Sequence, residues 1–506
     1  MAAPIRKGCA AVLLTLLFAA TTHAATGERS LVAAAQANDR AAALAMLKRR
    51  VDVNAPDADG TTALHWAVYH DDVELVRRLL KAGAKANVRN EYGSTPMMEA
   101  AVTGNAEVIR LLLKAGADPD SANEDGQTAL MVLARTSHVD AARLLLRRGA
   151  NVNAVERRRG QTALMWAAAQ SQPAMVELLI AHGADVNARS TAKTNQRQVT
   201  GEPRAQVRPV GGLTALLYAA RQGCERCVHA LVEGGADIDM ADPEGVTPLI
   251  MAINNFNFDI AAYLIEQGAN PNKWDWWGRT PLYLAVDLNT LPHGGRPDRP
   301  SLDRTTSLEL IEMLLERGAN PNARLKLFPP YRALGPDRGA DMMLTIDATP
   351  LLRAAKAGDV PAIRLLLEYG ANPHLANIYG HTPIMAAAGL GSNEIDTRGK
   401  FKTQAQAVEA IELLVAAGAD VNAREFRRGQ TALHGAALWG WNDVVRALVA
   451  HHADLQAKDN NGMTPLDSAL GRAGGHGRGG TRIEVHQATA ALIEELTANA
   501  RTQSRL

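Results

Sequence analysis

The chain has 506 residues, of which 47% are hydrophobic and 4% aromatic, and its formal net charge is +1. It can bury a core, but it has no overall basic field that would attract nucleic acid, so nucleic-acid-binding proteins are excluded first. Alanine, leucine and glycine carry most of the small and apolar content, which favours short, closely packed helices.

The N-terminus has the order of a secretory targeting segment. Arg6 and Lys7 precede an apolar run over residues 9–20, and a small-x-small cleavage site ends at Ala24. We expect a signal peptide over residues 1–24, the alternative being a buried N-terminal helix. The run is shorter than the roughly 20 residues of a membrane-spanning helix. The mature chain is therefore expected to lack a membrane span and to be periplasmic or extracellular.

A segment of the form Gly-x-Thr-(Pro or Ala)-Leu recurs through the rest of the chain, and six of the ten intervals between its threonines are 33 residues. These threonines are Thr62, Thr95, Thr128, Thr162, Thr214, Thr247, Thr280, Thr349, Thr382, Thr431 and Thr464. Each is predicted to cap a short helix, and a second helix should end at the glycine of a later Gly-Ala-(Asp or Asn) segment. No such unit can bury its own apolar face, so the stack of units is the core.

This pattern resembles the ankyrin repeat, whose period is 33 residues. The segments 62–67 and 431–436, which read Thr-Ala-Leu-His-x-Ala, come closest to its signature. The resemblance implies an all-α fold, an ankyrin-repeat α-solenoid of helix-turn-helix units with β-turn fingers. We expect an N-terminal capping repeat at 25–57, repeats over 58–498 and a C-terminal tail at 499–506.

Irregular spacing places inserts at about 190–211, 289–306, 325–347, 390–404 and 471–480. The inserts at 190–211 and 471–480 are polar and rich in Gly and Arg, so we expect them to be mobile. The insert at 325–347 contains an aromatic and proline-rich segment and is expected to fold back and pack.

Aromatic residues on the fingers are the first candidate binding site. Trp274, Trp276 and Trp277 form a cluster, and Tyr92 and Tyr379 occupy the same repeat position as Trp277. In the ankyrin family this position, and those seven and eight after the threonine, usually face the binding groove. The latter are Tyr69, His70 and Trp439 here. Exposed Trp and Tyr are frequent binding hot spots; the alternative is that these rings pack on adjacent fingers or inserts.

Two basic fingertips are the second candidate. One contains Arg157, Arg158 and Arg159, and the other contains Phe426, Arg427 and Arg428; both expand the turn by one residue. Arginines at a tip can bind carboxylates or phosphates. A solvated turn with local Glu pairs is the alternative.

The cysteines of the mature chain, Cys224 and Cys227, are the third candidate. They are spaced to form a disulfide at the start of a helix, and an exported protein would hold them oxidised. A buried thiol is the alternative, because Cys227 sits where the repeat usually buries Val. We also find no metal-ligand spacing, phosphate loop or catalytic motif. No Asn-x-Ser/Thr sequon occurs, which favours a bacterial periplasm over a eukaryotic secretory route.

These observations predict a non-catalytic scaffold that binds a protein partner, without cofactor or metal, and that is a monomer. One alternative is a periplasmic thiol–disulfide protein that uses Cys224 and Cys227. Another is an enzyme whose site is built by the inserts, although these enter at different ends of the helices.

Overall fold

The computed structural model describes residues 30–197, 206–290, 303–327, 343–391, 402–472 and 485–503. The predicted signal peptide at 1–24 lies outside these residues, as do parts of all five predicted inserts. The chain divides into two compact units, Met1–Glu124 and Asp125–Leu506.

The first unit is a stack of three helix pairs. They are α1 (Leu31–Gln36) with α2 (Arg40–Lys48), α3 (Ala63–Tyr69) with α4 (Val73–Lys81), and α5 (Pro96–Thr103) with α6 (Ala106–Lys114). First helices contact first helices and second helices contact second helices, as α1 with α3 and α4 with α6. The pair α1 and α2 occupies the expected capping repeat, and the apolar side chains between the pairs form the core.

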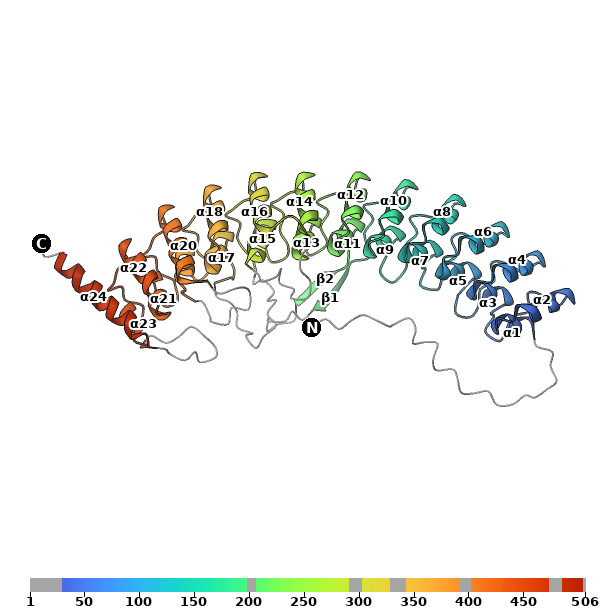
Figure 1. The fold of residues 1–506 in the computed structure, drawn as a ribbon, viewed down its shortest axis with the longest axis horizontal. Coiled ribbons are helices and arrows are strands. Elements are labelled where there is room, and N and C mark those ends of the chain that lie inside the picture. Colours follow the sequence, from blue (N-terminus) through green and yellow to red (C-terminus); the bar gives the residue numbers. More distant parts are fainter. Residues whose placement is uncertain are drawn as a thin grey trace, which may run out of the picture. The chain divides into compact units, whose positions relative to one another are not determined.

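The second unit continues the same pattern, and Figure 1 shows its helix pairs following one another in chain order. The first helices are α7 (Ala129–Thr136), α9 (Ala163–Ala169), α11 (Ala215–Gln222), α13 (Pro248–Asn254), α15 (Pro281–Asn289), α17 (Pro350–Ala357), α19 (Pro383–Ala387), α21 (Ala432–Leu438) and α23 (Pro465–Ala469). The second helices are α8 (Val139–Arg147), α10 (Pro173–Ala181), α12 (Glu225–Glu233), α14 (Phe258–Glu266), α16 (Ser307–Glu316), α18 (Val360–Glu368), α20 (Gln404–Ala416), α22 (Asn442–Ala450) and α24 (Gln487–Gln503). The predicted helical repeat fold is confirmed. Helix α24 includes residues 499–503, which were expected to be a tail.

Every repeat threonine is the N-cap of its first helix, as its place before the helix predicted. In most repeats the hydroxyl accepts the backbone N–H three residues later, as Thr95 accepts from Met98 at 3.2 Å. His65 and His434 add a reciprocal bond, because each ring nitrogen Nδ1 accepts the N–H of its threonine at 3.2 Å. Burial lowers the pKa of both imidazoles, which keeps them neutral and able to accept.

An asparagine ladder joins successive repeats through the Asn of the Gly-Ala-(Asp or Asn)-x-Asn segment. In unit 2, the Asn322 amide donates to the carbonyl of Gly370 at 3.0 Å and accepts the N–H of Asn372 at 2.7 Å. Asn153, Asn187, Asn272 and Asn422 make the same pair of bonds to the repeat that follows each of them. An amide satisfies one donor and one acceptor of the next turn at once.

The insert at 190–211 was expected to be mobile, but the structure places a β-hairpin there. Strand β1 (Lys193–Arg197) pairs antiparallel with β2 (Gln206–Val210), with Lys193 opposite Val210 and Arg197 opposite Gln206. One antiparallel ladder of backbone hydrogen bonds joins the two strands. The composition did not indicate these strands, and residues 198–205 between them lie outside the described residues.

The other inserts join the fold where the structure describes them. At the base of 325–347, Leu325 and Asp347 are joined by the Asp347 N–H to Leu325 carbonyl bond of 2.8 Å, and Met343 and Leu344 are fully buried. This end of the insert folds back and packs, whereas the aromatic and proline-rich segment lies outside the described residues. At the end of 390–404, the buried Lys402 ammonium donates to the carbonyls of Lys356 and Ala386, both at 2.9 Å. It thereby closes the ends of α17 and α19, where helix carbonyls lack partners.

Candidate protein-binding surface

One buried ion pair determines which tryptophans of the cluster are exposed to solvent. Asp275, 1% exposed, accepts the N–H groups of Trp277 and Arg279, and its second oxygen lies 2.6 Å from the Arg279 guanidinium. The guanidinium carbon in turn lies 4.9 Å from the centre of the Trp277 ring. Trp277 is consequently 7% exposed, whereas Trp274 and Trp276 remain 51% and 38% exposed.

The next finger extends this exposed aromatic surface. The Lys326 N–H donates to the Trp277 carbonyl at 2.8 Å, which sets the two fingers edge to edge. The Lys326 ammonium then lies 3.5 Å from the centre of the Trp274 ring, and Leu327 is 38% exposed beside it. We call Trp274, Trp276, Lys326 and Leu327 the tryptophan surface. The spacing of the tryptophans indicated part of it, but Lys326 and Leu327 belong to an insert and carry no repeat signal.

Three of the remaining predicted residues of the aromatic set lie in unit 1. Tyr92 is highly exposed, and Tyr69 is half-exposed with its ring edge-on to Trp66, 5.7 Å between ring centres. His70 is half-buried, and its Nε2 lies 3.0 Å from the Gln36 carbonyl oxygen. Tyr69 and His70 are therefore neighbours on one helix end, and Tyr92 is on a separate finger.

In unit 2, Tyr379 and Trp439 are both half-buried. The Arg427 guanidinium lies 5.5 Å from the Tyr379 ring centre. The Trp439 indole N–H donates to the Gly389 carbonyl at 2.8 Å, and its ring lies beside Trp441. Trp439 thus also packs against the base of the insert at 390–404, the alternative that the sequence left open.

Both basic fingertips are built on a buried glutamate. Glu156, 2% exposed, accepts the N–H groups of Arg158 and Arg159 at 2.7 Å and of Gln161 at 3.1 Å. Glu425 accepts from the backbone of its own turn in the same way. Ordinary fingers use Asp or Asn here, as Asp459 does for two N–H groups. A turn longer by one residue needs a side chain longer by one methylene, which explains the glutamates. Sequence reasoning missed this role.

The tips differ in how they expose their side chains. Arg157, Arg158 and Arg159 are exposed. At the second tip, Phe426 is 72% exposed and Arg427 is exposed, whereas Arg428 is half-buried. Gly380 lies under the Phe426 ring, which would meet an added Cβ at 2.7 Å.

Cys224 and Cys227 form a disulfide at the start of α12, with Cα atoms 5.2 Å apart. Cys224 is 8% exposed and Cys227 is fully buried. The pairing predicted from their spacing is therefore present, and both sulfurs are shielded from solvent.

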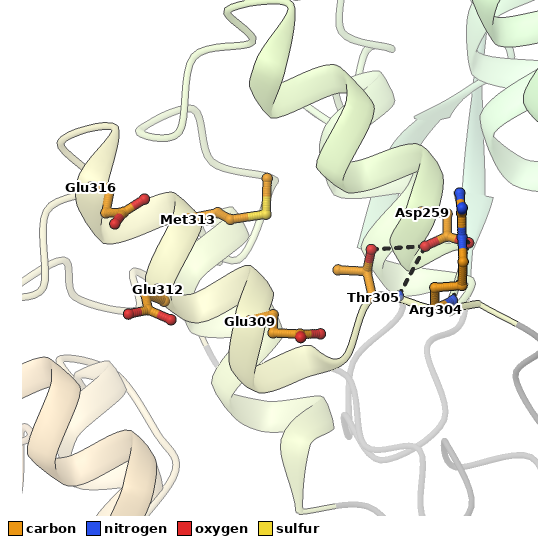
Figure 2. Close-up of a pocket in the computed structure, with 7 residues that line it drawn as sticks. All are labelled: Asp259, Arg304, Thr305, Glu309, Glu312, Met313 and Glu316. Atoms are coloured by element: carbon orange, nitrogen blue, oxygen red, sulfur yellow. Dashed lines mark hydrogen bonds and ion pairs between the residues drawn. The ribbon is translucent and has the colours of Figure 1, made fainter.

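A surface groove of about 640 Å³ lies on the side of the second helices, where sequence reasoning placed no site. Figure 2 shows Asp259 at the start of α14 facing Arg304 and Thr305, with Glu309, Glu312, Met313 and Glu316 along α16. Burial alone would raise the pKa of Asp259, but hydrogen bonds from Thr305 and Arg304 outweigh it and lower the pKa. Glu309 closes the capping box of Thr306. Asp259 and Glu309 therefore act as helix-end groups in this groove.

Over the described ranges, no helix is both long and apolar enough to cross a membrane. The same residues contain no group of three or more His, Cys, Asp or Glu side chains placed to hold a metal ion.

Comparisons with family models agree with this architecture. The family model described as ankyrin repeats (3 copies) matches residues 31–123, 115–190, 216–325 and 402–476, and the single ankyrin repeat model matches 347–378. The chain is similar to the E3 ubiquitin-protein ligase KEG of Arabidopsis thaliana, with 25% identity over 52% of this chain and 16% of that protein. It is also similar to the human SH3 and multiple ankyrin repeat domains protein 2, with 31% identity over 41% of this chain and 10% of that protein. Among solved structures, the human ASB11 ankyrin repeat domain matches 48% of this chain and 100% of its own, with 22% identity and a TM-score of 0.39.

The chain spans a small part of the length of these two curated relatives, 16% and 10%. Both are eukaryotic proteins, so they lend no support to the bacterial origin expected from the sequence. The family models together cover more than half of the chain, and they follow the helix pairs described above. This chain belongs to the ankyrin-repeat family.

Proposed function

We propose that this chain is a non-catalytic scaffold that binds a protein partner through the tryptophan surface. The observation that carries the proposal is the pair of half-exposed indoles, Trp274 and Trp276, on one finger. Two large apolar side chains at neighbouring exposed positions are typical of binding hot spots.

The turn itself does not require these indoles. In the finger around Asp242, the residues at the positions of Trp274 and Trp276 are Ala241 and Pro243, and the same backbone bonds form. In the finger around Asp459 they are Lys458 and Asn460. Small or polar residues therefore suffice for the fold, which supports a role in binding for the tryptophans.

Lys326 adds a positive charge to the tryptophan surface and restrains one of its indoles. Its ammonium above the Trp274 ring forms a cation–π contact that restrains the indole and keeps a positive charge next to it. A restrained aromatic loses little conformational entropy on binding, so it contributes more to affinity than a mobile one.

We further propose that the scaffold acts as a monomer outside the cytoplasm, in the periplasm or beyond the cell. The order of charged and apolar residues over 1–24 and the disulfide between Cys224 and Cys227 both support export. Mass spectrometry of the purified native protein tests this directly. A mature N-terminus at Ala25 is expected, and an intact N-terminus in a reduced chain would contradict export. Sedimentation at increasing protein concentration tests for a monomer.

The partner is tested by crosslinked capture from native host cells. The wild-type chain is compared with Trp274→Ala/Trp276→Ala, in which the buried Trp277 is kept so that the turn still folds. Tyr369→Ala is the matched control, because Tyr369 is 41% exposed and lies at the end of α18. Circular dichroism establishes that all three chains are equally folded.

We expect a specific partner to be captured by wild type and by Tyr369→Ala and to be lost with the double variant. A partner held equally by all three would place the binding site elsewhere. No partner for any of them would contradict the scaffold function.

A further inference from the structure

Four exposed cations gather on two neighbouring fingers of unit 2. They are Arg158, Arg159, Arg189 and Lys193, which we call the basic platform. The Thr191 N–H donates to the Arg159 carbonyl at 2.7 Å, which joins the two fingers. The platform adjoins the base of the β1–β2 hairpin, since Lys193 is the first residue of β1.

The charges of the platform are not neutralised by its own contacts. The Lys193 ammonium donates to the Arg158 carbonyl at 3.2 Å, and the Arg189 guanidinium donates to the Ala241 carbonyl. Carbonyls accept hydrogen bonds but carry no net charge. Within the part of the chain that the structure describes, none of the four platform residues forms an ion pair with a carboxylate.

For Arg158 and Arg159, the nearest carboxylate along the chain is committed elsewhere. Glu156 is 2% exposed and accepts three backbone N–H groups of its own turn. Between Asp185 and Glu202 the chain carries Arg189, Lys193 and Arg197 but no further Asp or Glu, and the Asp185 carboxylate accepts the N–H of Asn187 at 2.9 Å. Positive charge is therefore concentrated here in a chain whose formal net charge is only +1.

The backbone that carries the platform is also held in place. Gly160 has φ +64°, and an added Cβ would lie 2.3 Å from the Thr191 hydroxyl, so the two fingers touch closely at this point. The arginines thus project from a fixed turn. Clustered like charges on a rigid turn oppose folding, and the fingers around Asp242 and Asp459 form without such a cluster, so a solvated turn leaves it unexplained.

We propose that the basic platform binds a carboxylate-rich, extended segment of a protein partner. The proposal rests on the scaffold function and adds a second docking point to it. Guanidinium groups match carboxylates in a two-bond geometry, and one such contact per arginine suits an extended acidic chain. A protein segment is favoured over nucleic acid because the exposed apolar neighbour is the aliphatic Val155, 56% exposed, and the platform contains no aromatic ring on which a base could stack.

The probe is a fluorescein-labelled peptide of alternating Glu and Gly, titrated with the full mature chain and followed by fluorescence anisotropy. The test variants are Arg158→Gln/Arg159→Gln and Arg189→Gln/Lys193→Gln. The matched control is Arg143→Gln/Arg147→Gln, which removes two exposed cations from α8. An oligothymidine of equal charge is the competing probe.

We expect each platform variant to weaken peptide binding by about tenfold or more, and the control variant by less than about twofold. Raising NaCl from about 50 to about 300 mM should weaken wild-type binding far more than binding by a platform variant. Equal losses in the control variant, tighter binding of the oligothymidine at the same arginines, or no binding of the peptide would each overturn the proposal.

The two proposals can fail separately. Trp274→Ala/Trp276→Ala should leave peptide binding unchanged, because the tryptophan surface lies on different fingers. If that variant loses the captured partner and the wild type does not bind the peptide, the proposed scaffold function stands and the proposed binding of an acidic segment is rejected.

Discussion

Asp242 offers the sharpest test of how the finger turns are stabilised. Its Oδ1 atom accepts the N–H groups of Glu244 and Val246, both at 2.9 Å. Burial, together with the charges of Glu244 and Asp275, raises the pKa of this carboxyl to about 6. At neutral pH the turn therefore holds an ionised carboxylate in surroundings that favour the neutral form. Asn90 and Asn377 perform the same turn function elsewhere in the chain without a charge.

The change Asp242→Asn should therefore stabilise the protein at neutral pH. A pKa raised from 3.8 to about 6 corresponds to about two pH units, and at about 1.4 kcal/mol per unit the ceiling is about 3 kcal/mol. Because the carboxyl is only half-buried, solvent screens part of this electrostatic cost, and we expect Asp242→Asn to raise the free energy of unfolding by about 1–2 kcal/mol.

The pH dependence has a defined sign. The folded-state pKa lies above the unfolded value, so the contribution of Asp242 is fully present below about pH 4 and is lost as the pH rises through about 6. The difference in free energy of unfolding between Asp242→Asn and wild type should accordingly be near zero at about pH 4 and should favour the variant by about pH 7.

Urea denaturation of both chains, followed by circular dichroism at the two pH values, measures this difference. Asp242→Ala is the control, because it removes the acceptor as well as the charge and should be less stable than Asp242→Asn throughout. A wild-type chain that is as stable as Asp242→Asn at about pH 7, or a difference that does not change with pH, would refute the reasoning.

Three further predictions concern contacts between repeats and within a helix end. Asn322→Ala should lower the free energy of unfolding by about 1–3 kcal/mol, because the Gly370 carbonyl and the Asn372 N–H both lose their partner. Urea denaturation measures this change, and an unchanged free energy of unfolding would contradict the role of the asparagine ladder. Lys402→Met keeps the aliphatic stem but leaves two carbonyls at helix ends without their donor, so the melting temperature should fall. A higher melting temperature would show that the cost of desolvating the ammonium outweighs its hydrogen bonds to these carbonyls. Replacing Cys224 and Cys227 by Ala should cost about 2 kcal/mol, since a short closed loop restricts the unfolded chain little, and reduction of the wild type should have a similar effect in thermal unfolding.

The local part of this fold could be read from the sequence. The 33-residue spacing, the threonine caps and the end of each second helix depend on contacts between residues close in the chain, such as Thr95 with Met98. Such contacts recur in most repeats, so their residues recur too. The disulfide belongs with them, since Cys224 and Cys227 are three residues apart on one helix end.

Contacts between repeats required the tertiary structure. Sequence placed Trp274, Trp276 and Trp277 together, but only the buried pair of Asp275 and Arg279 and the neighbouring finger decide that Trp277 turns inward while the other two stay exposed. The inserts carry no periodic signal, because their partners lie tens of residues away. The Lys402 bonds to α17 and α19 and the placement of Lys326 over an indole could not be inferred for that reason. The sequence by itself thus determined the repeat and its caps, whereas the side chains available to a partner were decided by packing between repeats.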